Sequence, residues 1–299
     1  MSDMSQHNRS LLERAAEAYD FGAALRAPVA APAPKAAPAE PAPVKVERPV
    51  EIRRAPAGTA ALDRARLTAA GFIDPEANVT GLAEEFRLIK HQLLADIEQS
   101  KQPEERRRAV LIASAQPKSG KTFCAINLAL SLAGEKGVEV LLVDGDFPKP
   151  DVLATLGLAS GPGLVDALAD PGLDAESLII RTDVAGLSVL PAGRKTNNVP
   201  ELLASGRSRE VLAKLIAGDK RRIILFDSPP ALMASHATML AGHVGRALVV
   251  VRADQTTEAD LRETIGLLQG CEISLILNGA GLAVTGRKFG AYDGYGHDD

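Results

Sequence analysis

The stretch "IASAQPKSGKTFCAINLALSLA", residues 112–133, joins an apolar, strand-like run to a helix-spaced apolar pattern through a few small or polar residues. The free backbone N–H groups of a helix's first turn, together with the positive end of the helix dipole, bind anions such as phosphate. The hinge of this stretch consists of Lys118, Ser119, Gly120, Lys121 and Thr122. The pattern therefore predicts a phosphate-binding loop between a strand and a helix.

The residue types at this hinge suit a bound nucleotide. Gly120 lets the backbone approach a phosphate without a Cβ, Lys121 can reach the β and γ oxygens, and the Thr122 hydroxyl can bind Mg²⁺. The motif G-x-x-x-x-G-K-[ST] has Ala115 in place of its first glycine. A solvated turn before a core helix is the alternative for the motif alone, and the flanking strand and helix patterns favour the phosphate loop.

Apolar runs alternate with helical patterns along most of the chain. A helix is predicted at 80–99, with Leu82, Phe86, Ile89, Leu93 and Ile97 facing inward. Strands are predicted at 109–115, 138–146, 186–193, 222–230, 246–253 and 272–278. Nearly continuous Val, Ile and Leu runs separated by helices predict an α/β fold, in which a mostly parallel sheet carries helices on both faces.

Carboxylates follow two of these strands at the edge where ligands bind in such sheets. Asp144 and Asp146 end the second strand, and Asp227 closes the "IILFD" run. One aspartate at a strand end is typical of a turn or a helix cap, but three beside a phosphate loop indicate a nucleotide site. We expect Asp144 to act as the base for an incoming hydroxyl, and Asp146 and Asp227 to hold hydrated Mg²⁺ together with Thr122.

Composition divides the 299-residue chain into four parts. A capping box and an apolar stripe predict a short amphipathic helix at 9–21, within a first part at 1–25. Proline and alanine dominate the next stretch, which we interpret as a disordered linker at 26–75. The catalytic domain is then expected at 76–283, and a flexible tail at 284–299.

Charge and hydropathy restrict the class of protein further. The formal net charge is −4 with both signs interspersed, so no nucleic-acid partner is expected. No window approaches 18 consecutive apolar residues, and the N-terminus lacks an apolar signal core. These features predict a cytoplasmic protein.

Three motifs in order carry a family resemblance: "SAQPKSGKT", "LLVDGDFPKP" and "ILFDSPP". They resemble the Walker A, A′ and B motifs of the bacterial tyrosine autokinases (BY-kinases) of exopolysaccharide biosynthesis, which are relatives of the MinD/ParA ATPases. The N-terminal "SLLERA" further resembles the subgroup found with exosortase systems. The resemblance implies a protein-tyrosine kinase that uses ATP and Mg²⁺, is activated by a membrane polysaccharide co-polymerase (chain-length determinant protein), and lies at the inner membrane through that partner.

The resemblance also implies roles for individual residues. Catalysis is assigned to Lys121, Asp144 and Asp146, and nucleotide binding to Lys118, Ser119, Gly120, Lys121, Thr122, Phe123 and Asn278, of which Asn278 is placed at the adenine edge. The short tail offers Tyr292 and Tyr295 as phosphate acceptors. A helix bearing Glu84, Arg87 and Lys90 matches the family's E-x-x-R-x-x-R helix, so ring-shaped self-assembly through these charges on one side of the helix is implied.

A MinD/ParA-like ATPase switch, which positions a membrane or a cargo without phosphorylating tyrosine, is the alternative function. Those ATPases carry a characteristic lysine where this chain has Gln116, and the chain shows no C-terminal amphipathic membrane helix. The tyrosine kinase is therefore the favoured interpretation. Lys118 is a departure from the kinase pattern, because glycine is usual at that position.

Overall fold

The computed structural model describes residues 58–74 and 80–280. The predicted helix at 9–21, most of the predicted linker, the tail and both tail tyrosines lie outside the described residues. Within the described part, no helix is both long enough and apolar enough to cross a membrane.

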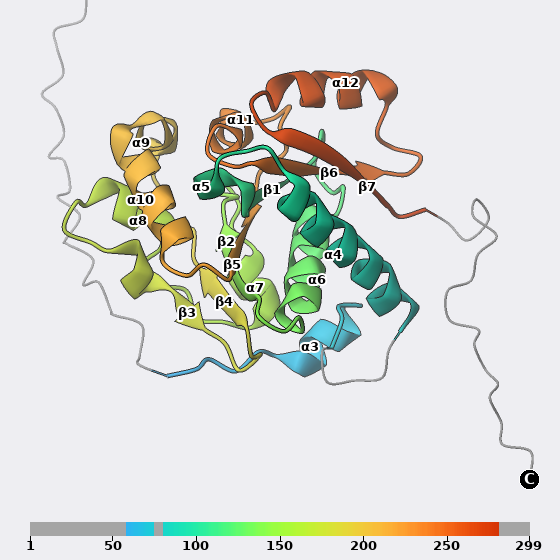
Figure 1. Cartoon of the computed structure of the whole chain (residues 1–299), viewed down its shortest axis with the longest axis horizontal. Coiled ribbons are helices and arrows are strands. Elements are labelled where there is room, and N and C mark those ends of the chain that lie inside the picture. The colour runs from blue at the N-terminus through green and yellow to red at the C-terminus, as the bar shows by residue number, and fades with distance from the viewer. Residues whose placement is uncertain (1–57, 75–79, 281–299) are drawn as a thin grey trace, which may run out of the picture. The chain divides into compact units, whose positions relative to one another are not determined.

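A seven-stranded sheet forms the centre of the described domain, in the order β3-β4-β2-β5-β1-β6-β7 (Figure 1). Its strands are β1 (Ala109–Ala113), β2 (Glu139–Asp144), β3 (Ile180–Arg181), β4 (Leu187–Leu190), β5 (Arg222–Asp227), β6 (Arg246–Arg252) and β7 (Glu272–Asn278). All neighbours pair in parallel except β3, which runs antiparallel to β4 at one edge. All six predicted strands are therefore present, and the predicted α/β fold is confirmed.

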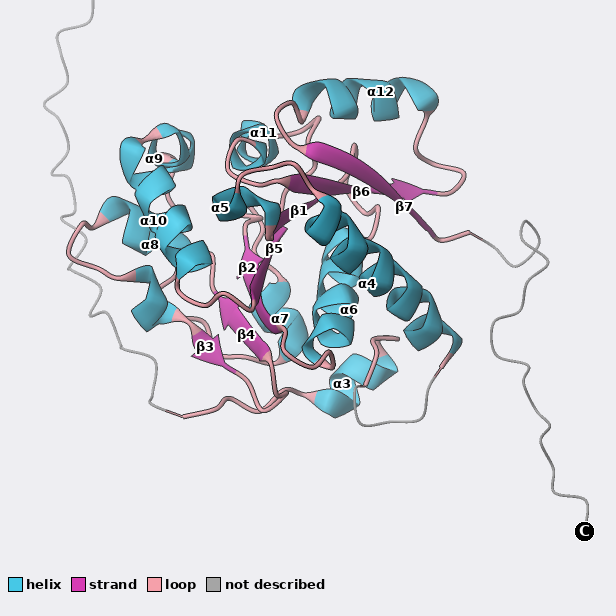
Figure 2. Ribbon diagram, viewed as in Figure 1, coloured by secondary structure: helices cyan, strands magenta, loops and turns pink. Residues whose placement is uncertain are grey.

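Helices cover both faces of this sheet (Figure 2). One face is packed by α3 (Arg64–Ala69), α4 (Gly81–Gln99), α6 (Lys121–Ala133) and α7 (Val152–Leu156). The other face is packed by α8 (Leu164–Ala169), η1 (Ala175–Leu178), α9 (Val199–Ala204), α10 (Gly206–Ala217), α11 (Ser235–Ala241) and α12 (Glu258–Leu267). The short helix α5 (Glu104–Arg107) leads into β1.

The central strands are buried on both sides, which explains their unbroken apolar sequences. In β1, Val110 and Ile112 point to the α6 face, and Leu111 points to the opposite face. Successive side chains of a strand alternate between faces, so a strand between two helical layers needs apolar residues at every position. This arrangement brings the C-terminal ends of β1, β2 and β5 to one edge of the sheet, because the three strands are parallel.

Residues 58–74 belong to this domain and not to the linker that composition predicts at 26–75. Leu62, Leu67 and Ile73 are 4–9% exposed and join the α6-face core. The sequence does not predict this packing, because the one helix of the segment has only six residues, too few to show an apolar period. The domain therefore begins at least 18 residues earlier than the expected boundary at 76, since it includes residues 58–74.

The same segment is also hydrogen-bonded to two distant parts of the domain. The Ala60 N–H donates to the carbonyl of Arg181 at 2.8 Å, which extends the sheet edge beyond β3. The Ile73 N–H donates to Oδ1 of the buried Asn127 in α6 at 2.8 Å. Residues 58–74 therefore connect the sheet edge to the helix that follows the phosphate loop.

Candidate active site

The loop between β1 and α6 is held in shape by its own side chains. The hydroxyls of Ser114 and Ser119 both donate to the carbonyl oxygen of Gln116, each at 2.8 Å. Two residues of the loop adopt left-handed backbone angles, Lys118 with φ 61° and Gly120 with φ 91°. Glycine adopts this region freely, whereas a lysine there is strained. The loop's own side chains therefore hold it in a defined, partly strained conformation.

Gly120 is required at its position for a second reason. A Cβ there would lie 2.1 Å from Nδ2 of Asn278, which donates to the Ser119 carbonyl at 2.9 Å. Asn278, predicted at the adenine edge, is thus brought to the phosphate loop itself. Its side-chain amide already binds the loop, so a contact to adenine would have to use its other amide atoms.

Lys121 begins α6 and is enclosed by the site. Lys121 is 7% exposed. Burial lowers the pKa of its ammonium, while the charges of Asp227 and Asp146 oppose that shift. Helix α6 has no acidic residue in its first turn, so its N-terminal end keeps a positive potential. The lysine and the helix end together favour a bound anion.

Thr122 and Asp227 meet at the same edge. Thr122 Oγ1 donates to Asp227 Oδ2 at 2.6 Å, and Asp227 Oδ1 has no hydrogen-bond partner in the described part of the chain. Burial raises the pKa of Asp227 to about 7, although the Thr122 hydrogen bond opposes the rise. A buried carboxylate oxygen without a partner costs free energy, which a bound cation would offset.

The two A′ carboxylates differ in exposure. Asp144 is 1% exposed and accepts a hydrogen bond from the Val152 N–H at 3.1 Å, and its Oδ1 has no partner among the described residues. Burial raises its pKa to about 7, against opposing backbone hydrogen bonds that include the one from Val152. Asp146 is half-buried and accepts from the Lys149 N–H at 3.2 Å; burial raises its pKa too.

These donors fit Mg²⁺. No three His, Cys, Asp or Glu side chains in the described ranges converge into a metal cluster. Mg²⁺ does not need one, since it is usually held by one or two carboxylates with waters and substrate phosphates. The buried, unpartnered Oδ1 of Asp227, the half-buried carboxylate of Asp146 and the Thr122 hydroxyl are hard oxygen ligands of the required kind.

His236 also borders the site. Its ring meets the Phe147 ring edge-on at 5.9 Å, and its Nδ1 is buried without a hydrogen-bond partner among the described residues. Burial lowers the pKa of His236, while the charge of Asp146 opposes the shift. No motif in the sequence predicts that this histidine lies beside the A′ segment that carries Asp146 and Phe147.

Phe123 differs from the other predicted nucleotide residues. Its ring lies 5.1 Å from that of Phe72 and 6.4 Å from that of Phe86. The side chain therefore belongs to the packing between α6, α4 and the segment before α4, and a nucleotide contact would come from its main chain. The Phe72–Phe123 pair connects residues 58–74 to the first turn after the phosphate loop.

The three predicted assembly charges do not form one stripe. Glu84 and Arg87 pair at 2.8 Å on the exposed side of α4. Lys90, predicted on the same side, is 8% exposed and pairs with Glu135 beyond the end of α6 at 2.8 Å. The prediction that Lys90 lies on the same side as Glu84 is wrong, because six residues at about 100° each place it about 240° around the helix from Glu84.

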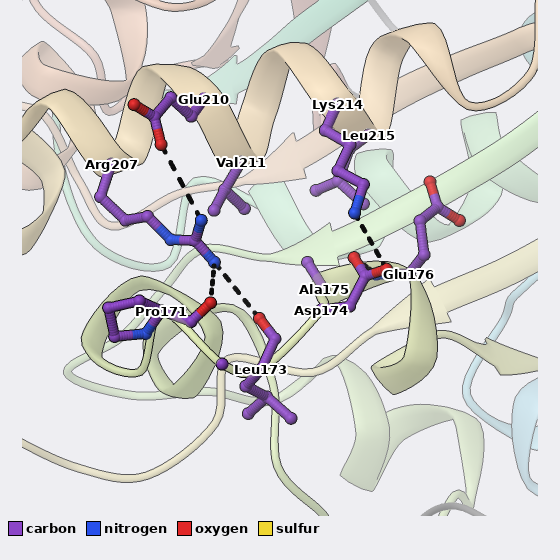
Figure 3. A pocket seen from close by; sticks show the side chains of 11 residues that line it. Pro171, Leu173, Asp174, Ala175, Glu176, Arg207, Glu210, Val211, Lys214 and Leu215 are labelled. Atoms are coloured by element: carbon purple, nitrogen blue, oxygen red, sulfur yellow. Dashed lines mark hydrogen bonds and ion pairs between the residues drawn. The ribbon is translucent and has the colours of Figure 1, made fainter.

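A cavity of about 440 Å³ lies between α10 and the 171–176 segment, apart from the predicted site residues (Figure 3). Lys214 pairs there with Asp174 at 3.0 Å, and Arg207 donates to the carbonyls of Pro171 and Leu173. Its cationic side chains thus have partners within the chain. We place the candidate active site at the β1–α6 edge and not in this cavity.

The fold and the site together define a P-loop nucleotide-binding protein. No family model matches the sequence. Individual relatives do: the putative tyrosine-protein kinase EpsB of Ralstonia nicotianae is 33% identical over 166 residues, which cover 56% of this chain and 22% of EpsB. Tyrosine-protein kinase YwqD of Bacillus subtilis is 28% identical over 190 residues, which cover 64% of this chain and 77% of YwqD.

A solved structure agrees with these sequence matches. The kinase domain of VpsO is 33% identical, with a TM-score of 0.57, over 67% of this chain and 95% of that domain. The chain belongs to the bacterial tyrosine kinase family. It spans only about a fifth of the length of EpsB, so the activity of the longer relative does not transfer by similarity alone.

Proposed function

We propose that the chain is an ATP-dependent protein-tyrosine autokinase that regulates exopolysaccharide or capsule polymerisation and export. One observation carries the proposal: in a member of this family, Lys121 and Thr122 of the phosphate loop meet Asp227 at the sheet edge where the A′ carboxylates also lie. That set contains a phosphate ligand and metal ligands, which phosphoryl transfer requires.

The loop and Lys121 bind the β- and γ-phosphates of ATP. The N–H groups at the start of α6 point to the phosphates, and Ser119, Gly120 and Lys118 shape the loop around them. Thr122, Asp146 and Asp227 hold Mg²⁺ in this proposal. When bound, the ion would neutralise charge that develops on the transferred phosphoryl group.

Asp144 is the proposed base. The tyrosine oxygen forms a bond to the γ-phosphorus, the bond from that phosphorus to the bridging oxygen of ADP breaks, and the phenolic proton passes to Asp144. A pKa raised to about 7 suits this role, because a base is most effective when its pKa lies near the working pH. Asp146 shares the A′ segment and completes the catalytic set with Lys121.

The acceptors and partners in this proposal come from the family. Tyr292 and Tyr295 of a neighbouring subunit receive the phosphate, within a ring-like homo-oligomer to which Glu84 and Arg87 contribute. A membrane polysaccharide co-polymerase is the proposed activator and would place the kinase at the inner membrane. A kinase domain from about residue 58 to 283, followed by a tyrosine-bearing tail, is the corresponding domain organisation.

Incubation of the full chain with Mg·ATP tests the function. We expect phosphotyrosine on the protein by intact mass, and a loss of that mass shift in Lys121→Ala. Lys136→Ala is the matched control, because Lys136 is exposed beyond the end of α6 and outside the site. Phosphate release without any phosphotyrosine would favour the MinD/ParA-like ATPase switch instead.

A further inference from the structure

Two side chains from the β6–β7 end of the sheet contact the phosphate-binding loop from outside. Gln116 Nε2 donates to Asp260 Oδ2 at 2.9 Å, and Asn278 Nδ2 donates to the Ser119 carbonyl at 2.9 Å. Asp260 lies in the first turn of α12, and Asn278 ends β7. The loop is therefore tied to elements that come more than 140 positions later in the sequence, since Gln116 and Asp260 are 144 apart.

The Asp260 carboxylate is itself fixed. Its Oδ2 also accepts from the Thr257 hydroxyl at 2.8 Å, and the Asp260 N–H donates back to that hydroxyl at 3.1 Å. The Thr257 N–H also donates to Asp260 Oδ2 at 3.4 Å, and together with the bond from the Asp260 N–H this forms a capping box, which holds the side chain at the start of α12. Asp260 therefore offers Gln116 an acceptor at a defined position.

Gln116 is held from the other side by the loop. Its carbonyl accepts the hydroxyl hydrogen bonds of Ser114 and Ser119, so its main chain is fixed while its side chain reaches α12. The two outside contacts, at Gln116 and Ser119, flank Lys118, the strained residue with φ 61°. A strained backbone persists only where its surroundings over-determine it.

We propose that Asp260, acting through Gln116, is a positioning residue of the phosphate-binding loop. The hydrogen bond keeps the loop in the conformation that presents its N–H groups to phosphate. Loss of the bond lets the loop occupy other conformations, and the apparent affinity falls with the competent fraction. The inference rests on the proposed function only in that the loop binds the phosphates of ATP.

Loss of this hydrogen bond should weaken ligand binding without lowering stability; Gln116→Met tests this, because Asp260→Ala also removes the capping box of α12. Gln116 is exposed and Asp260 is half-buried, so their hydrogen bond contributes little to folding. Titration calorimetry of the full chain with Mg·ATP is the assay, and urea unfolding is measured in parallel. The variants are Gln116→Met, which keeps the length of the side chain but removes the donor, Asp260→Ala, and the double variant.

Glu258→Gln is the matched control. It removes a negative charge from the same turn of α12, but Glu258 pairs with Arg262 and not with the loop. We expect the affinity of this control to stay within about twofold of the wild type. Each single test variant should bind about three- to tenfold more weakly. The affinity of the double variant should equal that of the single variant with the larger loss, because both substitutions remove the same hydrogen bond.

Additive losses in the double variant would overturn the proposal, as would unchanged affinity in Gln116→Met. An affinity loss matched by a lower urea midpoint in Gln116→Met would also overturn it, since the pair would then be structural. A wild-type protein that binds no Mg·ATP would refute the proposed function itself. By contrast, Mg·ATP binding that is equal in the wild type and the variants would refute only the positioning role of Asp260.

Discussion

Thr122 Oγ1 donates a 2.6 Å hydrogen bond to Asp227 Oδ2, although the two residues lie 105 positions apart in the sequence. The bond brings the Walker A threonine to the Walker B aspartate. Asp227 is 1% exposed, and burial raises its pKa to about 7. The site is thus assembled by the fold at a cost in carboxylate solvation, and this cost has a measurable pH dependence.

The contribution of Asp227 and Asp144 to the free energy of unfolding of the nucleotide-free protein in EDTA should fall as pH rises from about 4 to about 7. His236 and His243 oppose this trend, because burial lowers their pKa. The pKa of Asp227 and of Asp144 is raised in the folded state from 3.8 to about 7, so the folded state keeps protons that the unfolded state releases in this window. The stability they contribute is complete below the unfolded pKa and is lost as pH rises through the folded pKa. Urea unfolding at several pH values measures the trend.

Asp227→Asn should reduce this pH dependence, because the amide has no proton to lose. Asp254→Asn, an equal charge change at an exposed residue, is the control and should leave the slope as in the wild type. A wild-type slope in Asp227→Asn would contradict the assignment of the shift to this carboxylate.

Lys118→Gly should stabilise the nucleotide-free protein and weaken its binding of Mg·ATP. Glycine adopts the left-handed backbone at φ 61° without strain, which stabilises the folded state. The greater conformational entropy of glycine in the unfolded chain offsets part of this gain, and the free energy of unfolding should rise by about 0.5–1 kcal/mol. Lys118→Met should weaken binding similarly, since it also removes the charge, but should give no gain in stability. If both variants show equal unfolding free energies, the backbone at this position is not strained.

Leu67→Ala should destabilise the domain by about 2–4 kcal/mol, because Leu67 is 4% exposed and packs into the α6-face core. Leu88→Ala is the control, because Leu88 is 56% exposed on α4. Urea unfolding compares the two. An effect of Leu67→Ala no larger than that of Leu88→Ala would restore the interpretation of residues 58–74 as linker.

Arg87→Glu and Lys90→Glu should separate assembly from folding. Arg87 is exposed, so its reversal should lower the mass seen by light scattering without changing the unfolding midpoint. Lys90 is buried against Glu135, so its reversal places like charges together and should lower the midpoint. An unchanged mass for Arg87→Glu, where the wild type assembles, would remove this residue from the interface.

Much of the fold follows from the sequence because its signals are local. Unbroken apolar runs predict all six long strands, but β3 was missed, since two residues cannot show a period. The predicted strands are also longer than the observed ones. The sequence predicts a strand at 109–115, whereas β1 ends at Ala113, where the loop begins. Burial continues through Ser114 to Ala115, so burial alone does not mark this end.

The site followed from motifs where one residue type dictates the chemistry, as at Lys121, Thr122 and Asp227. The residues that position the site cannot be predicted from motifs, because they act through contacts between distant segments. Asp260 has the sequence pattern of a helix cap, and only the fold brings it to Gln116. Lys90 fits a surface motif, yet the fold gives it a partner in Glu135.

Phosphopeptide mapping after incubation of the full chain with Mg·ATP tests the central claim most directly, that this site transfers phosphate from ATP to tyrosine. The account predicts phosphate on Tyr292 and Tyr295, its loss in Lys121→Ala, and its loss in the double variant Tyr292→Phe and Tyr295→Phe with unchanged Mg·ATP affinity. Active protein that releases phosphate but carries none on any tyrosine would contradict it.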